Sequence, residues 1–426
     1  MSHDSLTLVS ILAHALAVGA GDRSEVRVRD DGLVQRIDVV TAGQFSLAVR
    51  TSRTNWSLSY LPTLTQLSLG TKDSSLIVLH TGSLQVGVGL SPRTSFSFGE
   101  SFTYGEQNFR LLNLGAVPGV TSVTPSTTTN AEQPPPTSSA MQPSWTSQTI
   151  RYVSLASVAT VNHQLDRRWS SLARVGYNSS QSLDSESRKQ LPRVQSANGG
   201  VMFANTVSER DRLAIRIDLS RTVTNSTYIT SLALLATDFT RLISRETTFG
   251  VSVGAAYAQV SIPPIQTNVT SGLPSIDSPY NTGRNKSSHT SYSAYPVLAA
   301  YTNSVYPFGR TSLTFGLREE MAPVVDRMTG RAVMRLISTL NTTVAHRQVS
   351  FGLIGSGTNN LVDSQQPQTL RYALTFNEFV QYRILTSWLF ELGARQSKFS
   401  FANSPQTPMI WSIYFAASYT TGMVPL

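Results

Sequence analysis

The chain has 426 residues, and charged residues make up only 14% of them, whereas soluble domains carry about 25%. The hydrophobic share is 40%, the mean hydropathy is −0.08, and no run of about 20 apolar residues follows the N-terminal region, which excludes a bundle of membrane-spanning helices. Cysteine is absent, which excludes disulfides and thiolate metal sites. The formal net charge is +9, but no run of basic residues forms a stripe, so we expect no nucleic-acid partner.

The N-terminal region contains an apolar stretch, residues 5–20, that ends in the small residues Val18-Gly19-Ala20. This pattern is typical of a secretory signal peptide, so we predict a signal peptide at residues 1–20 and a mature chain from residue 21. The first four residues lack Lys and Arg, however, and His14 interrupts the apolar run. The alternative is a short N-terminal helix that plugs or caps the fold.

From about residue 30 onward, apolar and polar residues alternate with a period of two. In residues 211–220, Leu213, Ile215 and Ile217 share one face, whereas Arg216 and Asp218 lie on the other. A strand has this pattern when one face meets lipid and the other meets water. The pattern predicts 18 strands, with 16 as the alternative. Their expected ranges are 33–41, 43–51, 54–70, 76–90, 93–104, 150–163, 167–179, 193–206, 211–225, 228–241, 245–260, 290–304, 310–322, 330–343, 347–358, 368–382, 385–398 and 408–420.

The connections between these segments alternate in length. Short connections that often carry charge, such as Asp166-Arg167 and Glu209-Arg210, alternate with longer ones, such as 180–192 and 359–367. Up-and-down barrels sort their connections in this way, because their periplasmic turns are tight and their external loops are larger. We therefore predict an all-β fold, a single up-and-down antiparallel transmembrane β-barrel at 21–426. It would lie in an outer membrane with both termini periplasmic.

Two long connections stand out, at about 105–148 and 261–289. Residues 117–147 are rich in Thr, Ser and Pro, and such a composition can neither join a strand ladder nor bury a core. We expect both to be long flexible loops that could fold inward and narrow the pore. The alternative is a linker between an N-terminal domain (21–115) and a barrel of fewer strands.

No catalytic or metal-binding motif is present in the sequence. The six His are not at metal-ligand spacing, and the HExxH, GxSxG and P-loop patterns are absent. We therefore predict no enzyme activity and no cofactor.

Charged residues on the polar faces of the expected strands are the candidate functional residues. By parity they line the lumen, where six Arg and three carboxylates would favour anionic solutes. The alternative is that they pair with one another and brace the wall. The candidates are Arg174, Arg216, Asp218, Arg318, Glu320, Arg335, Arg371, Glu391 and Arg395.

Several short phrases are similar to those of known barrels. They are Tyr104-Gly-Glu-Gln-Asn-Phe109, Gln164-Leu-Asp-Arg-Arg-Trp-Ser170, Ser208-Glu-Arg-Asp-Arg-Leu213 and Ile243-Ser-Arg-Glu-Thr-Thr248. They resemble the repeating turn-strand phrases of poorly characterised, myxobacterium-like Gram-negative outer-membrane barrels. Barrels of this style occur beside exopolysaccharide-export systems, so the resemblance implies export of a polysaccharide.

Together these patterns predict an outer-membrane channel that passes solutes or an exported polysaccharide through a polar, net-basic lumen. The alternative is a plugged structural or interaction barrel within a cell-envelope or surface machine. The expected partners are outer-membrane lipid, an anionic solute or polysaccharide, and periplasmic export components.

Overall fold

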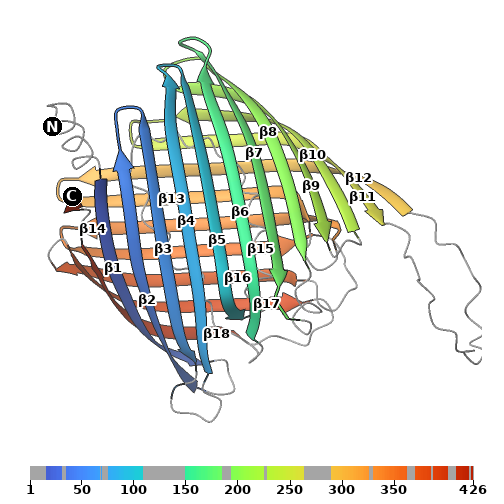
Figure 1. Ribbon diagram of the computed structural model, residues 1–426. Coiled ribbons are helices and arrows are strands. Elements are labelled where there is room, and N and C mark those ends of the chain that lie inside the picture. Colours follow the sequence, from blue (N-terminus) through green and yellow to red (C-terminus); the bar gives the residue numbers. More distant parts are fainter. Residues whose placement is uncertain are drawn as a thin grey trace, which may run out of the picture.

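The chain forms one closed antiparallel β-barrel of 18 strands, shown by the computed structural model in Figure 1. Each strand pairs with the next one in the chain, and β18 pairs with β1 to close the wall. The structure describes residues 16–30, 35–67, 69, 75–108, 149–184, 193–224, 228–262, 289–325, 330–361, 370–384, 387–401, 409–421 and 424–425.

Strands make up most of the described residues. In chain order they are β1 (Leu16–Asp30), β2 (Gln35–Arg50), β3 (Thr54–Leu67), β4 (Ser75–Ser91), β5 (Thr94–Asn108), β6 (Thr149–Gln164), β7 (Trp169–Ser182), β8 (Val194–Thr206), β9 (Asp211–Thr224), β10 (Tyr228–Leu242), β11 (Thr247–Ile262), β12 (His289–Phe308), β13 (Thr311–Val325), β14 (Ala332–His346), β15 (Val349–Asn360), β16 (Leu370–Ile384), β17 (Trp388–Phe401), β18 (Ile410–Thr420) and the two-residue β19 (Val424–Pro425). Within the described ranges, no helix is long and apolar enough to cross a membrane.

The predicted fold class and the count of 18 strands are confirmed, but two strand assignments are wrong. Residues 33–51 were divided into two strands, whereas Gln35–Arg50 is the single strand β2. The ladder between β2 and β3 is interrupted where Gly43 lies beside Pro62, because proline has no N–H to donate. The strand that the sequence analysis missed is β1, so the two errors cancelled in the count.

β1 overlaps the predicted signal peptide. It begins at Leu16, and Ala17 and Val18 pair with β19, whereas the pairing with β18 begins at Gly21. Cleavage after Ala20 would therefore leave the closing pairs with β18 intact. The signal peptide itself stays a prediction.

The first five strands belong to the same wall as the others. β5 pairs with β6 from Thr94–His163 to Asn108–Thr149, so the described residues before the long connection do not form a separate domain. The predicted loop segment 105–148 begins within β5, and the predicted loop segment 261–289 begins within β11 and ends at the first residue of β12. The remaining residues, 109–148 and 263–288, lie outside the described residues.

The connections at one end are all short, and those at the other end are mostly longer, with 31–34 and 225–227 as exceptions. We call the end with the short connections the short-turn end, and the opposite end the loop end. At the short-turn end, side-chain oxygens accept backbone N–H groups, which closes tight turns. Asp166 Oδ1 accepts the N–H groups of Arg168 at 2.6 Å and Trp169 at 2.7 Å, and Ser208 Oγ repeats the arrangement in the next short turn. The start of β1 and the end of β18 also lie at this end, where the Thr421 N–H donates to the Ala20 carbonyl.

The two faces of the wall differ in polarity. On β9, Ile215 and Ile217 are exposed on one face, whereas Arg216, on the opposite face, is buried. On β18, Phe415 is exposed and Tyr414 is buried in the same alternation. Side chains on the polar face contact one another across intervening strands, as the concave side of a barrel allows, so we call it the inner face. The apolar outer face matches the lipid-facing surface of a membrane barrel.

Candidate functional site on the inner wall

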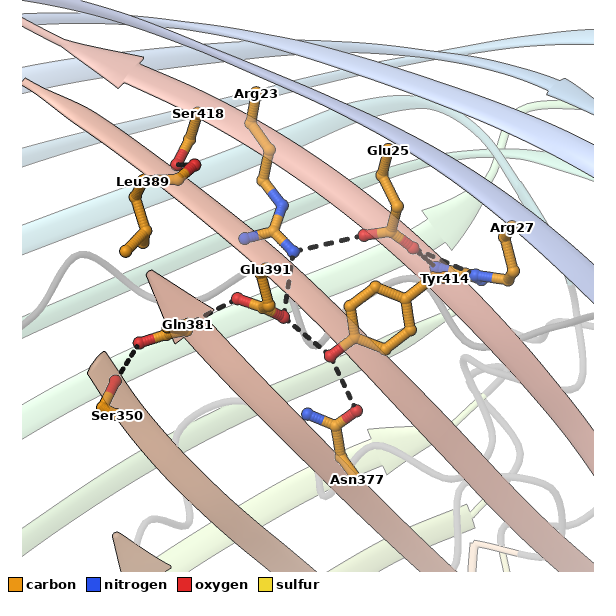
Figure 2. A network of polar contacts seen from close by, with 10 residues as sticks. All are labelled: Arg23, Glu25, Arg27, Ser350, Asn377, Gln381, Leu389, Glu391, Tyr414 and Ser418. Atoms are coloured by element: carbon orange, nitrogen blue, oxygen red, sulfur yellow. Dashed lines mark hydrogen bonds and ion pairs between the residues drawn. The ribbon is translucent and has the colours of Figure 1, made fainter. Parts of the chain in front are cut away.

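A continuous chain of polar contacts crosses the inner face where the barrel closes (Figure 2). Ser350 on β15 donates to Gln381 on β16 at 3.2 Å, and the Gln381 amide donates to Glu391 on β17 at 2.9 Å. Tyr414 on β18 contributes its hydroxyl, which lies 2.6 Å from Glu391 and 3.0 Å from Asn377 on β16. The contacts therefore join four neighbouring strands through side chains as well as through the backbone.

Three charged residues of β1 complete this network. Arg23 is shared between two carboxylates, since one guanidinium nitrogen lies 3.3 Å from Glu25 and 3.4 Å from Glu391. Arg27 donates to Glu25, with a distance of 3.0 Å from its Nε. The bridge from Arg23 to Glu391 passes over β18, because β1 and β17 are not neighbours. We call these residues, with Tyr414 and Arg395, the seam cluster.

Burial and a glycine shape the seam cluster. Glu25, Arg27, Glu391 and Tyr414 are all buried, so every charge here needs a partner within the protein. Gly393 on β17 lies beneath the Tyr414 ring, and a Cβ there would lie 2.4 Å from that ring. The glycine thus lets the ring cross β17 and reach β16. The guanidinium group of Arg395 lies over the Tyr414 ring, 5.4 Å from its centroid, which is a cation–π arrangement.

A second cluster lies on the part of the wall formed by β7 to β10. Arg174 donates to Asp218 at 2.9 Å across β8, and the Arg216 Nε lies 3.3 Å from Asp218 and 3.9 Å from Asp238. We call these four residues the wall cluster. Their side chains are 10–19% exposed, so they are more accessible than Glu25 and Glu391.

A glycine also makes the wall cluster possible. Gly200 on β8 lies between Arg174 and Asp218 in the register. A Cβ at position 200 would lie 2.1 Å from an Asp218 carboxylate oxygen. The carboxylate therefore leans over the glycine to reach β7.

The remaining candidates from the sequence form smaller contacts. Arg318 donates to Glu320 on its own strand at 2.5 Å, and Arg335 donates to Asn360 at 2.9 Å. The side chain of Arg371 lies outside the described residues. The structure thus brings Arg174, Arg216 and Asp218 together, and brings Glu391 and Arg395 together around Tyr414.

Sequence reasoning missed one of the four residues of the wall cluster and four of the six residues of the seam cluster, including Tyr414. It did not select Asp238, although residues 228–241 were expected to be a strand, and it missed Arg23, Glu25 and Arg27 because the first strand was placed after residue 30. The signal was present, since these three charged residues alternate with exposed Val26 and Val28 in the same period of two.

A segment at the loop end crosses the inner face. Thr230 of β10 donates its hydroxyl to the carbonyl of Gly330, which lies two residues before β14, and a Cβ on Gly330 would lie 2.6 Å from Tyr228. β10 and β14 are separated by β11, β12 and β13. Residues 332–335 stay paired with 322–325 of β13, which are not paired with β12, so this end of the β13–β14 pair leans over the inner face of β11 and β12. We call residues 330–335 the strap.

Burial supports this course of the strap. Ala332, Val333, Met334 and Arg335 are all buried, although inner and outer faces alternate along a strand. The inner-face residues Ala256, Ala258 and Val297 of the crossed strands are buried too, and Tyr295 donates to the Ala332 carbonyl at 3.1 Å. The strap therefore narrows the loop end. The sequence analysis had assigned this role to loops 105–148 and 261–289, whose central residues are not described.

The inner face carries ion pairs, amides and hydroxyls but no metal-binding group. Among the described residues, no cluster of three or more His, Asp or Glu could hold a metal ion. The arrangement can hydrate and orient a polar solute, and it defines the class of protein as a transmembrane β-barrel with a polar interior.

The sequence matches the model of one family, the EpsX exopolysaccharide export family, over residues 12–392. The chain therefore belongs to this family. No curated protein matches the sequence.

Solved outer-membrane barrels resemble the structure loosely. OpdL from Pseudomonas aeruginosa aligns with a TM-score of 0.43 at 9% identity, covering 95% of this chain and 98% of that one. The FrpB iron transporter from Neisseria meningitidis gives 0.45 at 9% identity, covering 94% and 64%. CdiB from Acinetobacter baumannii gives 0.40 at 11% identity, covering 94% of this chain but only 60% of its own length. Likenesses at this level support no conclusion about function.

Proposed function

We propose that this barrel is the outer-membrane conduit through which an exopolysaccharide leaves the cell. The observation that carries the proposal is a closed barrel with a polar inner face in a chain of the exopolysaccharide export family. A hydrated sugar chain exchanges its hydrogen bonds with water for bonds to groups of similar polarity. The inner-face network of Ser350, Asn377 and Gln381 supplies both donors and acceptors of this kind.

The nine charged candidates are proposed to line this path. Most of those with described side chains are ion-paired, so bracing of the wall accounts for much of their role. The nine candidates nevertheless comprise six Arg and three carboxylates, which is a positive excess. Such an excess would favour anionic over cationic solutes.

The strap is proposed to be the constriction that opens for the polymer. A wide open pore would leak solutes, so a conduit needs a resting state that is narrowed until only small ions pass. Beside its ladder with β13, the strap contacts β10 through the bond from Thr230 to Gly330, and such a contact can exchange at modest cost. The short turns and both termini are proposed to face the periplasm, where export components would deliver the chain.

A reversible lock on the strap tests the conduit. The chain has no cysteine, so a disulfide between Thr224→Cys and Gly330→Cys would be unique. A Cβ on Gly330 lies 3.3 Å from the Thr224 Cβ, close to the roughly 3.5–4.5 Å that a disulfide needs. Cells that lack the protein would be complemented with the double variant, and surface polysaccharide would be measured before and after reduction.

The expected result is no surface polysaccharide while the disulfide is oxidised and recovery after reduction. Each single-cysteine variant controls for the strain of placing a side chain at Gly330, which has a φ of 64°. Normal polysaccharide in cells that lack the protein would overturn the proposal. In planar bilayers, we expect the reduced variant to conduct with anion preference, and a folded protein that never conducts would favour a structural barrel.

A further inference from the structure

The short-turn end carries an unusual concentration of arginine. Seven of the eight short connections contain at least one Arg, and in the eighth, 385–387, Arg383 lies two residues before it. These connections hold eight Arg and only three acidic residues. We call these eight arginines, together with Arg383 near the end of β16, the turn ring. They are Arg53, Arg93, Arg167, Arg168, Arg210, Arg245, Arg310, Arg347 and Arg383.

The guanidinium groups of the turn ring are free to bind. All nine side chains are exposed, and none forms an ion pair with a described residue within 4.0 Å. The turns are held by the backbone rather than by these side chains, since Arg53, Arg210 and Arg310 contribute their carbonyls to ladder bonds. The acids at this end are partly engaged, because Asp166 accepts backbone N–H groups and Glu246 accepts from Ser244.

The loop end has no such excess. The nine connections at that end, from 31–34 to 402–409, hold nine Lys or Arg and eight Asp or Glu. The short connections, although far shorter in total, therefore contribute more than half of the formal charge of +9. Along the sequence the basic residues are scattered, whereas the fold brings the short connections, which together carry an excess of basic residues, to one end of the barrel.

A ring of arginines around a pore mouth is suited to long anions. Successive turns lie two strands apart, which is about 10 Å around the rim at the usual strand spacing. Arginine binds carboxylate, sulfate and phosphate groups through paired N–H donors. A mouth lined by one sign of charge also focuses the field and raises the local concentration of the opposite ion. Spaced cations of this kind fit a chain with repeated acidic groups better than a single small anion.

Further arginines lie inside the barrel near the same end. Glu391, where Arg23 reaches β17, lies three residues from the start of that strand at the short-turn end. The seam cluster, which includes Arg23, Arg27 and Arg395, therefore begins just inside this mouth. A chain attracted to the turn ring would next meet these side chains, whereas a lipid headgroup outside the wall would not.

We propose that the turn ring is the entry site for an acidic polysaccharide, bearing carboxylate, sulfate or phosphate groups, on its way into the barrel. This inference rests on the proposed conduit function and adds the substrate class and the side of entry. It predicts that only polymer on the short-turn side engages the ring, because the loop end lacks the charge excess.

The test measures current block in planar bilayers of neutral lipid, with dextran sulfate and neutral dextran of equal length added to either side. We expect dextran sulfate on the short-turn side to block at about tenfold lower concentration than neutral dextran, and high salt to remove the difference. The variant Arg53→Gln, Arg210→Gln, Arg310→Gln should lose most of this preference. A matched control at the loop end, Arg151→Gln, Arg221→Gln, Lys398→Gln, should keep it.

Equal block by the two polymers, or the same loss in both triple variants, would overturn the inference. Repeating the measurement with phosphatidylglycerol in the bilayer tests the rival occupant. If the ring variant differs from wild type only with that lipid, the ring binds headgroups and the inference fails. Binding of dextran sulfate to detergent-purified protein keeps the two proposals apart, since ring-dependent binding without any conductance would contradict the conduit alone.

Discussion

The seam cluster and the wall cluster are built by the same device but serve different parts of the barrel. In each, a glycine on the middle strand lets a neighbouring side chain lean across it, Gly393 beneath Tyr414 and Gly200 beside Asp218. In each, an ion pair then joins strands that do not share backbone hydrogen bonds. The difference is burial, because the seam carboxylates are buried and the wall carboxylates retain contact with solvent.

That difference follows from the position of each cluster in the chain. The wall cluster braces strands that are close in sequence, whereas the seam cluster joins β1 to strands nearly 370 residues away. Closing such a long loop costs more chain entropy, and β18 is the shortest of the 18 wall strands. The Arg23–Glu391 ion pair, which crosses β18, therefore adds a side-chain connection across the shortest wall strand.

The largest effect is expected at Glu391. Glu391→Leu would leave Arg23, Gln381 and Tyr414 without their shared acceptor, and breaking a buried pair in this way costs about 3–5 kcal/mol. The free energy of unfolding in lipid vesicles, measured by urea titration, would report it. Glu391→Gln, which keeps the size and one acceptor oxygen, should cost clearly less. A loss below 1 kcal/mol for the leucine variant would contradict the role of the seam.

Asp218 should show a smaller effect by the same measurement. Asp218→Asn removes the charge that Arg174 and Arg216 share, but both side chains retain some solvent, so we expect a loss of about 1–2 kcal/mol. A double-mutant cycle with Arg174→Gln would isolate the pair. If Asp218→Asn cost as much as Glu391→Leu, burial would not be what distinguishes the clusters.

The same contrast shows what the sequence could and could not predict. The alternation of polar and apolar residues predicted the strands and their inner-face residues, because a period of two is a local pattern. It placed Arg216 and Asp218 on the same face of one strand. The bridges to Arg174, Asp238 and Arg23 depend on register between strands, which no local pattern specifies. β1 was missed for another reason, since its apolar start resembles a signal peptide. The strap was missed because nothing in the local sequence of residues 330–335 indicates that this part of the loop end turns inward.

The glycines offer a finer test of the wall cluster. Gly200→Ala should displace the Asp218 carboxylate and cost about 1 kcal/mol, because the added Cβ would lie 2.1 Å from its oxygen. Gly199→Ala is the matched control, since its Cβ would meet nothing closer than the Arg174 carbonyl at 3.6 Å. We expect the control to change stability by less than about 0.5 kcal/mol. Equal effects in both variants would assign the cost to backbone preference rather than to the ion pair.

The smallest effect is expected at the short-turn end, away from both clusters. The backbone N–H groups of Trp169 and Arg168 hold the pKa of the Asp166 carboxyl below its usual value. A lowered pKa in the folded state means that ionised Asp166 stabilises the turn above the unfolded pKa, and that this stabilisation is lost as the pH falls through the folded pKa. Asp166→Asn should therefore be less stable than wild type at pH 7, and the two should converge in strong acid. Urea unfolding at pH 7, 4 and 2 would measure the difference. If the difference in stability between Asp166→Asn and wild type stayed constant with pH, the turn would depend on the shape of the side chain rather than on its charge. The uncharged Ser208 hydroxyl already holds the next short turn in this way.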